Sequence, residues 1–83
     1  MPQRLRYSQH ALQRLDERGI LRRWVDAVVS TRPRVYGRDQ LFTLSAAELA
    51  TRFGGDFADG LSVVVDGFRR RVVTVHWLDR RAA

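Results

Sequence analysis

Two histidines are the side chains of this 83-residue chain best suited to transferring protons near neutral pH. His10 lies in a segment with helical periodicity, and Arg14 and Arg18 follow it at intervals of four residues. At 3.6 residues per turn this spacing drifts by roughly 40° per step, so the three side chains form one stripe along a helix. His76 falls in a β-branched run, on the same face of its predicted strand as Thr74.

These residue types suit the cleavage of RNA without a metal ion. A ribose 2′-OH attacks the adjacent phosphate once a base removes its proton, an acid protonates the leaving 5′-oxygen, and cations stabilise the added charge. Imidazole can serve as the base or the acid, and guanidinium stabilises the phosphate. The predicted catalytic residues are His10, Arg14, Arg18 and His76. The hydroxyls of Ser8 and Thr74 are candidates to orient the phosphate.

Each of these side chains also has an ordinary structural interpretation. A histidine in the first turn of an exposed helix, or near the end of an edge strand, is commonly a plain surface residue. Arg14 and Arg18 could pair with Asp16, Glu17 or a neighbouring helix as solvated charges. Trp24 and Trp77 are expected in the core rather than as platforms for stacked bases.

A metal or cofactor site is not expected. The chain has no cysteine, and two histidines without paired carboxylates make a weak metal site. The glycines at 54, 55 and 60 do not follow the pattern of a phosphate-binding loop.

The charge of the chain points to an anionic partner. The formal net charge is +6, and all 15 basic residues are arginine. Codon bias in a GC-rich genome could explain the preference for arginine over lysine, but it does not explain the excess of basic over acidic residues. A positive domain attracts polyanions, and arginine binds phosphate through two parallel hydrogen bonds. We therefore expect nucleic acid or an acidic protein as partner. Within an RNA-binding protein, Arg69, Arg70 and Arg71 are candidates to hold the RNA backbone. The alternative for these three arginines is a run of solvated charges in a turn.

The pattern predicts a single α+β domain spanning 1–83. Helices are expected over 9–18, capped by Ser8 and ended by Gly19, and over 21–30, closed by Pro33. A capping-box pattern at Ser45 predicts a short helix over 46–53. The segments 35–36 and 41–44 could form one interrupted strand or a short hairpin, and 61–65 with 71–77 form a hairpin. The two N-terminal helices should pack on one face of a small antiparallel sheet.

Strict alternation assigns the faces of the last hairpin. The apolar set expected to pack on the helices is Leu61, Val63, Val65, Val73, Val75 and Trp77. The set expected on the open face is Ser62, Val64, Asp66, Val72, Thr74 and His76.

No apolar run approaches the roughly 20 residues that span a bilayer, and the start of the chain does not resemble a signal peptide. We therefore expect a cytoplasmic protein with no membrane partner.

The segment from Tyr7 to Ile20 resembles the opening of a family of small bacterial proteins known as a domain of unknown function. The shared motif is His-Ala, then Arg three residues on, then Arg-Gly four further, here His10-Ala11, Arg14 and Arg18-Gly19. In that family a second helix and a short strand region follow, and a terminal hairpin ends in Val-Val-Thr-Val, which matches residues 72–75. The family resembles a branch of the RelE/ParE-like fold, within the barnase, EndoU, colicin and RelE grouping of toxins. The likeness covers nearly the whole chain, although the segment 45–60 is longer than the family's usual link.

The resemblance implies a RelE-like toxin of a toxin–antitoxin or polymorphic toxin system that acts on RNA, with an acidic antitoxin or immunity protein encoded beside it. It favours functional roles for His10, Arg14, Arg18 and Thr74; His76 lies outside the family's pattern. Two alternatives remain open. ParE-like members of the same fold inhibit a topoisomerase by binding it, and a basic module could bind nucleic acid without turnover.

Overall fold

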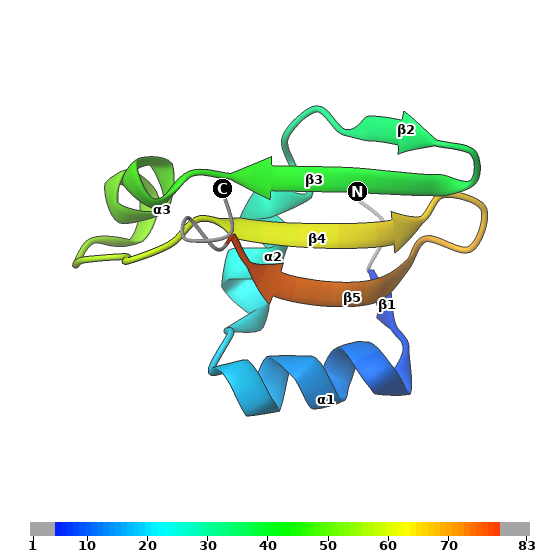
Figure 1. Ribbon diagram of the computed structural model, residues 1–83, viewed down its shortest axis with the longest axis horizontal. Helices are drawn as coiled ribbons and strands as arrows, with labels where there is room; N and C mark the ends of the chain where they lie inside the picture. Colours follow the sequence, from blue (N-terminus) through cyan, green and yellow to red (C-terminus); the bar gives the residue numbers. More distant parts are fainter. Residues whose placement is uncertain (1–4, 79–83) are drawn as a thin grey trace.

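Three helices and a five-stranded mixed sheet make up residues 5–78, the part of the chain described by a computed structural model (Figure 1). In chain order the elements are β1 (Arg6–Tyr7), α1 (Gln9–Arg18), α2 (Arg22–Val28), β2 (Arg34–Tyr36), β3 (Asp39–Leu44), α3 (Ala46–Phe53), β4 (Leu61–Asp66) and β5 (Arg71–Trp77). The predicted α+β class is confirmed. No helix within 5–78 is long and apolar enough to cross a membrane.

The sheet has the strand order β1-β5-β4-β3-β2. Strands β2 to β5 are antiparallel neighbours, and the predicted last hairpin is β4–β5. The two-residue β1 lies parallel to β5, with Arg6 opposite Arg71 and Tyr7 opposite Val72. The prediction of a purely antiparallel sheet is therefore wrong, because the segment before the first helix pairs with the outer edge of the last strand.

Local signals set the ends of the helices as the sequence predicts. The Ser8 hydroxyl accepts the N–H of Ala11 at 3.0 Å and begins α1, and Gly19 ends it in the left-handed region at φ 63°. Ser45 and Glu48 form the expected capping box at the start of α3. The second helix is shorter than predicted.

Hydroxyl groups account for the early end of α2. Ser30 Oγ donates to the carbonyl of Ala27, and Thr31 Oγ1 donates to that of Val28, each at 2.6 Å. The same two carbonyls also accept the backbone N–H groups of Ser30 at 3.2 Å and Thr31 at 3.1 Å, so the chain ends α2 in tighter turns in which the hydroxyls compete for helical acceptors.

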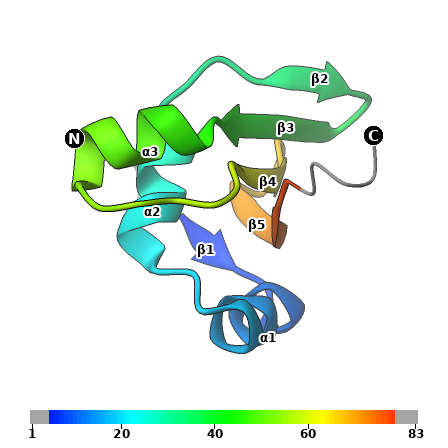
Figure 2. The ribbon, with the colours of Figure 1, turned by 60° about the vertical axis from the view of Figure 1, so that its left-hand side comes forward.

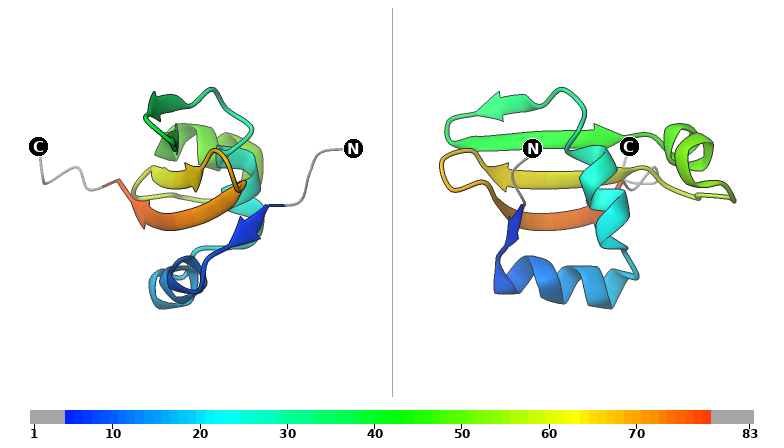
Figure 3. Two further views of the ribbon diagram at one scale, coloured as in Figure 1. Left: turned by 90° about the vertical axis from the view of Figure 1, so that its right-hand side faces the viewer. Right: turned by 180° about the vertical axis from the view of Figure 1, so that it is seen from behind.

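The two helices pack differently against the sheet (Figures 2 and 3). Helix α2 crosses the face formed by β3 and β4, whereas α1 runs beside β5 at the edge of the sheet. The prediction that both helices lie on one face therefore holds for α2 alone. Both still contribute to the core, through Ala11 and Leu15 of α1 and Val25 and Val28 of α2.

A β-bulge near the start of β5 changes the predicted side-chain alternation. Val65 lies opposite Val72, yet Val64 lies opposite Thr74, so Val73 is the extra residue. Val72 is fully buried in the core, whereas Val73 faces solvent and is 37% exposed. The predicted faces of Val72 and Val73 were thus wrong, because strict alternation cannot anticipate an inserted residue. Leu61, Val63, Val65 and Val75 are buried as predicted.

The bulge predicts very unequal losses of stability when the two neighbouring valines are replaced by alanine. Val72→Ala should lower the free energy of unfolding by about 2 kcal/mol, because it removes fully buried methyl groups. Val73→Ala should change it by less than about 0.5 kcal/mol. Urea unfolding of the two variants measures both values, and a larger loss for Val73→Ala would show that β5 alternates without a bulge.

Candidate functional site

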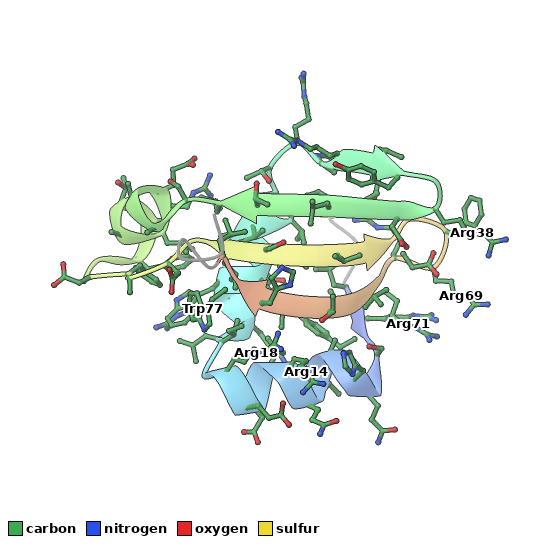
Figure 4. All side chains as sticks on the ribbon, in the orientation of Figure 1. Arg14, Arg18, Arg38, Arg69, Arg71 and Trp77 are labelled. Atoms are coloured by element: carbon green, nitrogen blue, oxygen red, sulfur yellow. The ribbon has the colours of Figure 1, made fainter. Side chains whose placement is uncertain are left out.

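The outer edge of β5 is held by helix α1 rather than by a long neighbouring strand. Within the described chain, β1 pairs with only the first two residues of β5, which leaves carbonyl groups free along its remaining edge. The hydroxyl of Ser8 donates to the carbonyl of Val73 at 3.2 Å, and Arg18 Nη1 donates to that of Val75 at 2.6 Å. The indole of Trp77 in turn donates to the carbonyl of Arg18 at 3.1 Å. The Arg18 guanidinium is therefore fixed against β5, in the space between strand and helix (Figure 4).

His76 lies beside this fixed guanidinium. Its side chain is half-buried, on the sheet face that none of the three helices of residues 5–78 covers. Burial lowers the pKa of His76 below its ordinary value of 6.5, and the positive charge of Arg18 lowers it further. The lowered pKa favours the uncharged imidazole at neutral pH, which is the form that can accept a proton.

The surroundings of His76 on this face are polar and small. Its cross-strand neighbour is Ser62, which is only 1% exposed, and Ser62 in turn lies opposite Thr43. Thr74 is half-buried two residues before His76 and shares the same face, as the sequence predicts. An imidazole, a guanidinium and a hydroxyl thus gather around the last half of β5.

The other two predicted catalytic residues lie apart from this group. His10 is exposed in the first turn of α1, and the eight residues to Arg18 correspond to about 12 Å along the helix axis. Arg14 forms an ion pair with Glu17, whose carboxylate also accepts the amide of Gln13 at 3.2 Å. The structure places the Arg18 guanidinium on the carbonyl of Val75, the residue before His76, and the charge of Arg18 acts on His76. Among the hydrogen bonds and ion pairs of residues 5–78, none joins His10 or Arg14 to this pair. Their catalytic roles stay predictions.

The residues predicted to bind RNA lie in three places, and of these only Thr74 belongs to the His76 group. Ser8 caps α1 and bonds to β5, so its hydroxyl already has a structural task. Arg69 and Arg70 are exposed in the turn between β4 and β5, and Arg71 begins β5 opposite Asp66. These three arginines therefore lie at the opposite end of β5 from His76.

The two tryptophans pack against the core, as predicted. Their ring centroids are 5.9 Å apart, and Phe57 meets the Trp24 ring edge-on at 5.1 Å. The three rings line a pocket of about 500 Å³ together with Asp56 and Asp59. Trp77 faces α2, whereas the adjacent His76 faces the other side of the sheet, so this pocket and the His76 group lie on different faces.

The turn around Phe68 contains surface residues that the sequence analysis did not single out. Phe68 is 77% exposed, and the guanidinium of Arg38 lies 5.5 Å from the centre of its ring. The sequence does show an aromatic residue inside a charged turn, which could have indicated a surface contact. It does not show that Arg38 lies near this ring, because that proximity depends on the pairing of β3 with β4.

Among residues 5–78 no group of three or more His, Asp or Glu side chains could hold a metal ion. Comparisons with protein-family models, with curated proteins and with solved structures give no match for this chain.

The environment of His76 predicts how stability depends on pH. The unfolded chain binds a proton on this histidine near pH 6.5, whereas the folded protein does so only at lower pH. The free energy of unfolding should therefore fall as pH decreases below about 6.5, because the unfolded state binds more protons there. Urea unfolding between pH 7.5 and 5 should show this loss, and His76→Gln should reduce it.

His10→Gln is the matched control, since it removes a histidine but leaves His76 and Arg18 in place. It should keep the same loss of stability as the unaltered protein. Equal pH profiles for His76→Gln and the unaltered protein would contradict the environment described for His76.

Proposed function

We propose that this chain is a toxin that cleaves RNA without a metal ion, with His76 as general base and Arg18 as the cation that stabilises the phosphate. The observation that carries the proposal is the pair itself. An imidazole whose uncharged form is favoured at neutral pH lies on a sheet face left open by the helices, next in the chain to the Val75 carbonyl that holds the Arg18 guanidinium. The net charge of +6 would draw RNA to the protein.

The proposed reaction uses the 2′-OH of the substrate as nucleophile. His76 accepts the 2′-OH proton while the 2′-oxygen forms a bond to phosphorus, and the bond from phosphorus to the 5′-oxygen breaks. The leaving oxygen takes a proton from water, and the products are a 2′,3′-cyclic phosphate and a 5′-OH end. Arg18 donates one N–H to the carbonyl of Val75, and its remaining N–H groups are available to the phosphate oxygens.

The toxin part of the proposal rests on the resemblance of the His10–Gly19 segment to the RelE/ParE-like family. The order of elements, with two helices before the hairpins, is compatible with that fold. We further propose that the chain acts in the cytoplasm and that an acidic antitoxin or immunity protein neutralises it. An acidic partner is suited to a surface with a charge of this sign.

A second candidate function is RNA binding without turnover. It is favoured by the structural tasks of two arginines, since Arg18 bonds to β5 and Arg14 pairs with Glu17. A ParE-like toxin that blocks a protein target would equally need no imidazole. Turnover, rather than binding, therefore separates the proposed function from these alternatives.

The test of the proposed function is cleavage of RNA in the presence of EDTA. The unaltered protein should cut, and His76→Gln should cut about 10²- to 10⁴-fold more slowly, the usual contribution of a general base. His10→Gln should retain most of the activity, because His10 lies about two helical turns from Arg18. Gel analysis of a defined oligonucleotide measures the rates.

The same oligonucleotide with 2′-O-methyl groups is the substrate control. It lacks the nucleophile, so it should not be cut. Cleavage of the methylated RNA, or full activity of His76→Gln, would contradict the mechanism. Loss of activity in His10→Gln alone would move the general base to α1.

A further inference from the structure

Two turns meet at the end of the sheet farthest from His76. The turn between β4 and β5 touches the turn between β2 and β3, because the N–H of Gly67 donates to the carbonyl of Arg38 at 2.8 Å. A Cβ at Gly67 would lie 2.9 Å from that carbonyl oxygen, so only glycine allows the two turns to pack this closely. Arg38, Arg69 and Arg71 extend from this end of the sheet (Figure 4).

The turn that carries Phe68 is held in one shape by Asp66. The Asp66 carboxylate accepts the N–H of Phe68 at 3.0 Å and that of Arg69 at 3.3 Å. The backbone carbonyl of Asp66 accepts the N–H of Arg70 at 2.9 Å. Arg70 has φ 53°, a conformation that L side chains rarely adopt. The side chains of this turn are thus presented by an ordered backbone rather than by a loose loop.

An exposed aromatic ring stands at the centre of this turn. Phe68 is 77% exposed, so its position contributes little to the core. Arg38 approaches the ring at 5.5 Å, and Tyr36, which precedes the neighbouring turn, is 59% exposed. Arginines surrounding an exposed aromatic ring combine the two features by which proteins bind single-stranded nucleic acid, namely base stacking and phosphate attraction.

We infer that these two turns form a binding site for single-stranded RNA, in which an unpaired base stacks on Phe68 while Arg38, Arg69 and Arg70 bind the flanking phosphates. This inference rests on the proposed function, which names RNA as the target. An unpaired strand is required because a base within a duplex is already stacked on its neighbours and cannot lie on a side chain.

This site is separate from the His76 group. His76 comes five residues after Arg71 in β5, which corresponds to about 17 Å along the strand. A single strand lying along β5 would therefore be gripped at the turns and cut at the far end of the same strand.

The test is binding of a short 2′-O-methyl RNA single strand, measured by fluorescence anisotropy at several salt concentrations. Phe68→Leu keeps the charge and an apolar side chain but removes the ring, so binding should weaken by about 5- to 100-fold with an unchanged salt slope. Phe68→Tyr, which keeps the ring, should bind as the unaltered protein does. Because Phe68 is exposed, circular dichroism should show all three proteins equally folded.

A matched pair of arginine variants tests the phosphate contacts. Arg69→Gln should weaken binding and reduce the salt slope by about 0.7, the value for one phosphate of a single strand. Arg52→Gln removes the same charge from α3, at the opposite end of the sheet, and should leave the slope nearly unchanged.

The inference is overturned if Phe68→Leu binds the single strand as tightly as the unaltered protein, or if it weakens binding of an RNA duplex to the same degree. The first result would leave the exposed ring as a contact for a protein partner. Because methylated RNA cannot be cut, a protein that binds as expected but never cleaves normal RNA would contradict the proposed function and leave this inference standing.

Discussion

The architecture depends on how the free edge of β5 is satisfied. An edge strand presents carbonyl groups that need hydrogen-bond partners, and β1 is too short to supply them. Helix α1 takes over this task through Ser8 at its start and Arg18 at its end, and Trp77 returns a hydrogen bond to the helix. These three hydrogen bonds, which we call the clasp on β5, fix α1 beside the sheet instead of on its face. It also fixes a guanidinium next to His76, so the electrostatic character of the candidate site is a consequence of how the edge is closed.

The bulge at Val73 has a comparable influence on the other side chains of β5. It lets both Val72 and Val75 enter the core, although three positions separate them. Because of the same insertion, Arg71 at one end of the strand and His76 at the other lie on the same sheet face. A regular strand would place them on opposite faces. The bulge thereby makes one continuous surface from the basic turns to the imidazole, which is the surface our proposals assign to RNA.

The parts of the fold with local causes could be predicted from the sequence. Ser8, Gly19 and the capping box at Ser45 mark helix ends through contacts within a few residues, and β-branched runs mark the last hairpin. The parallel pairing of β1, the bulge and the position of α1 arise from contacts between distant segments, so no local pattern reveals them. The same division holds for the site. The helical spacing of His10, Arg14 and Arg18 can be read from the sequence. Their different partners cannot, because only the folded structure shows that Arg14 pairs with Glu17 and that Arg18 bonds to β5.

The central claim is that the clasp on β5 holds the charge of Arg18 beside a half-buried His76. Titration of His76 by proton NMR tests it most directly, with His10→Gln used to assign the two histidine signals. We predict a pKa for His76 below its ordinary value and a rise toward that value in Arg18→Gln, whose amide can still donate to Val75. The rise should be partial, because burial is the larger cause of the lowering. A pKa at or above the ordinary value, unchanged by Arg18→Gln, would contradict the account.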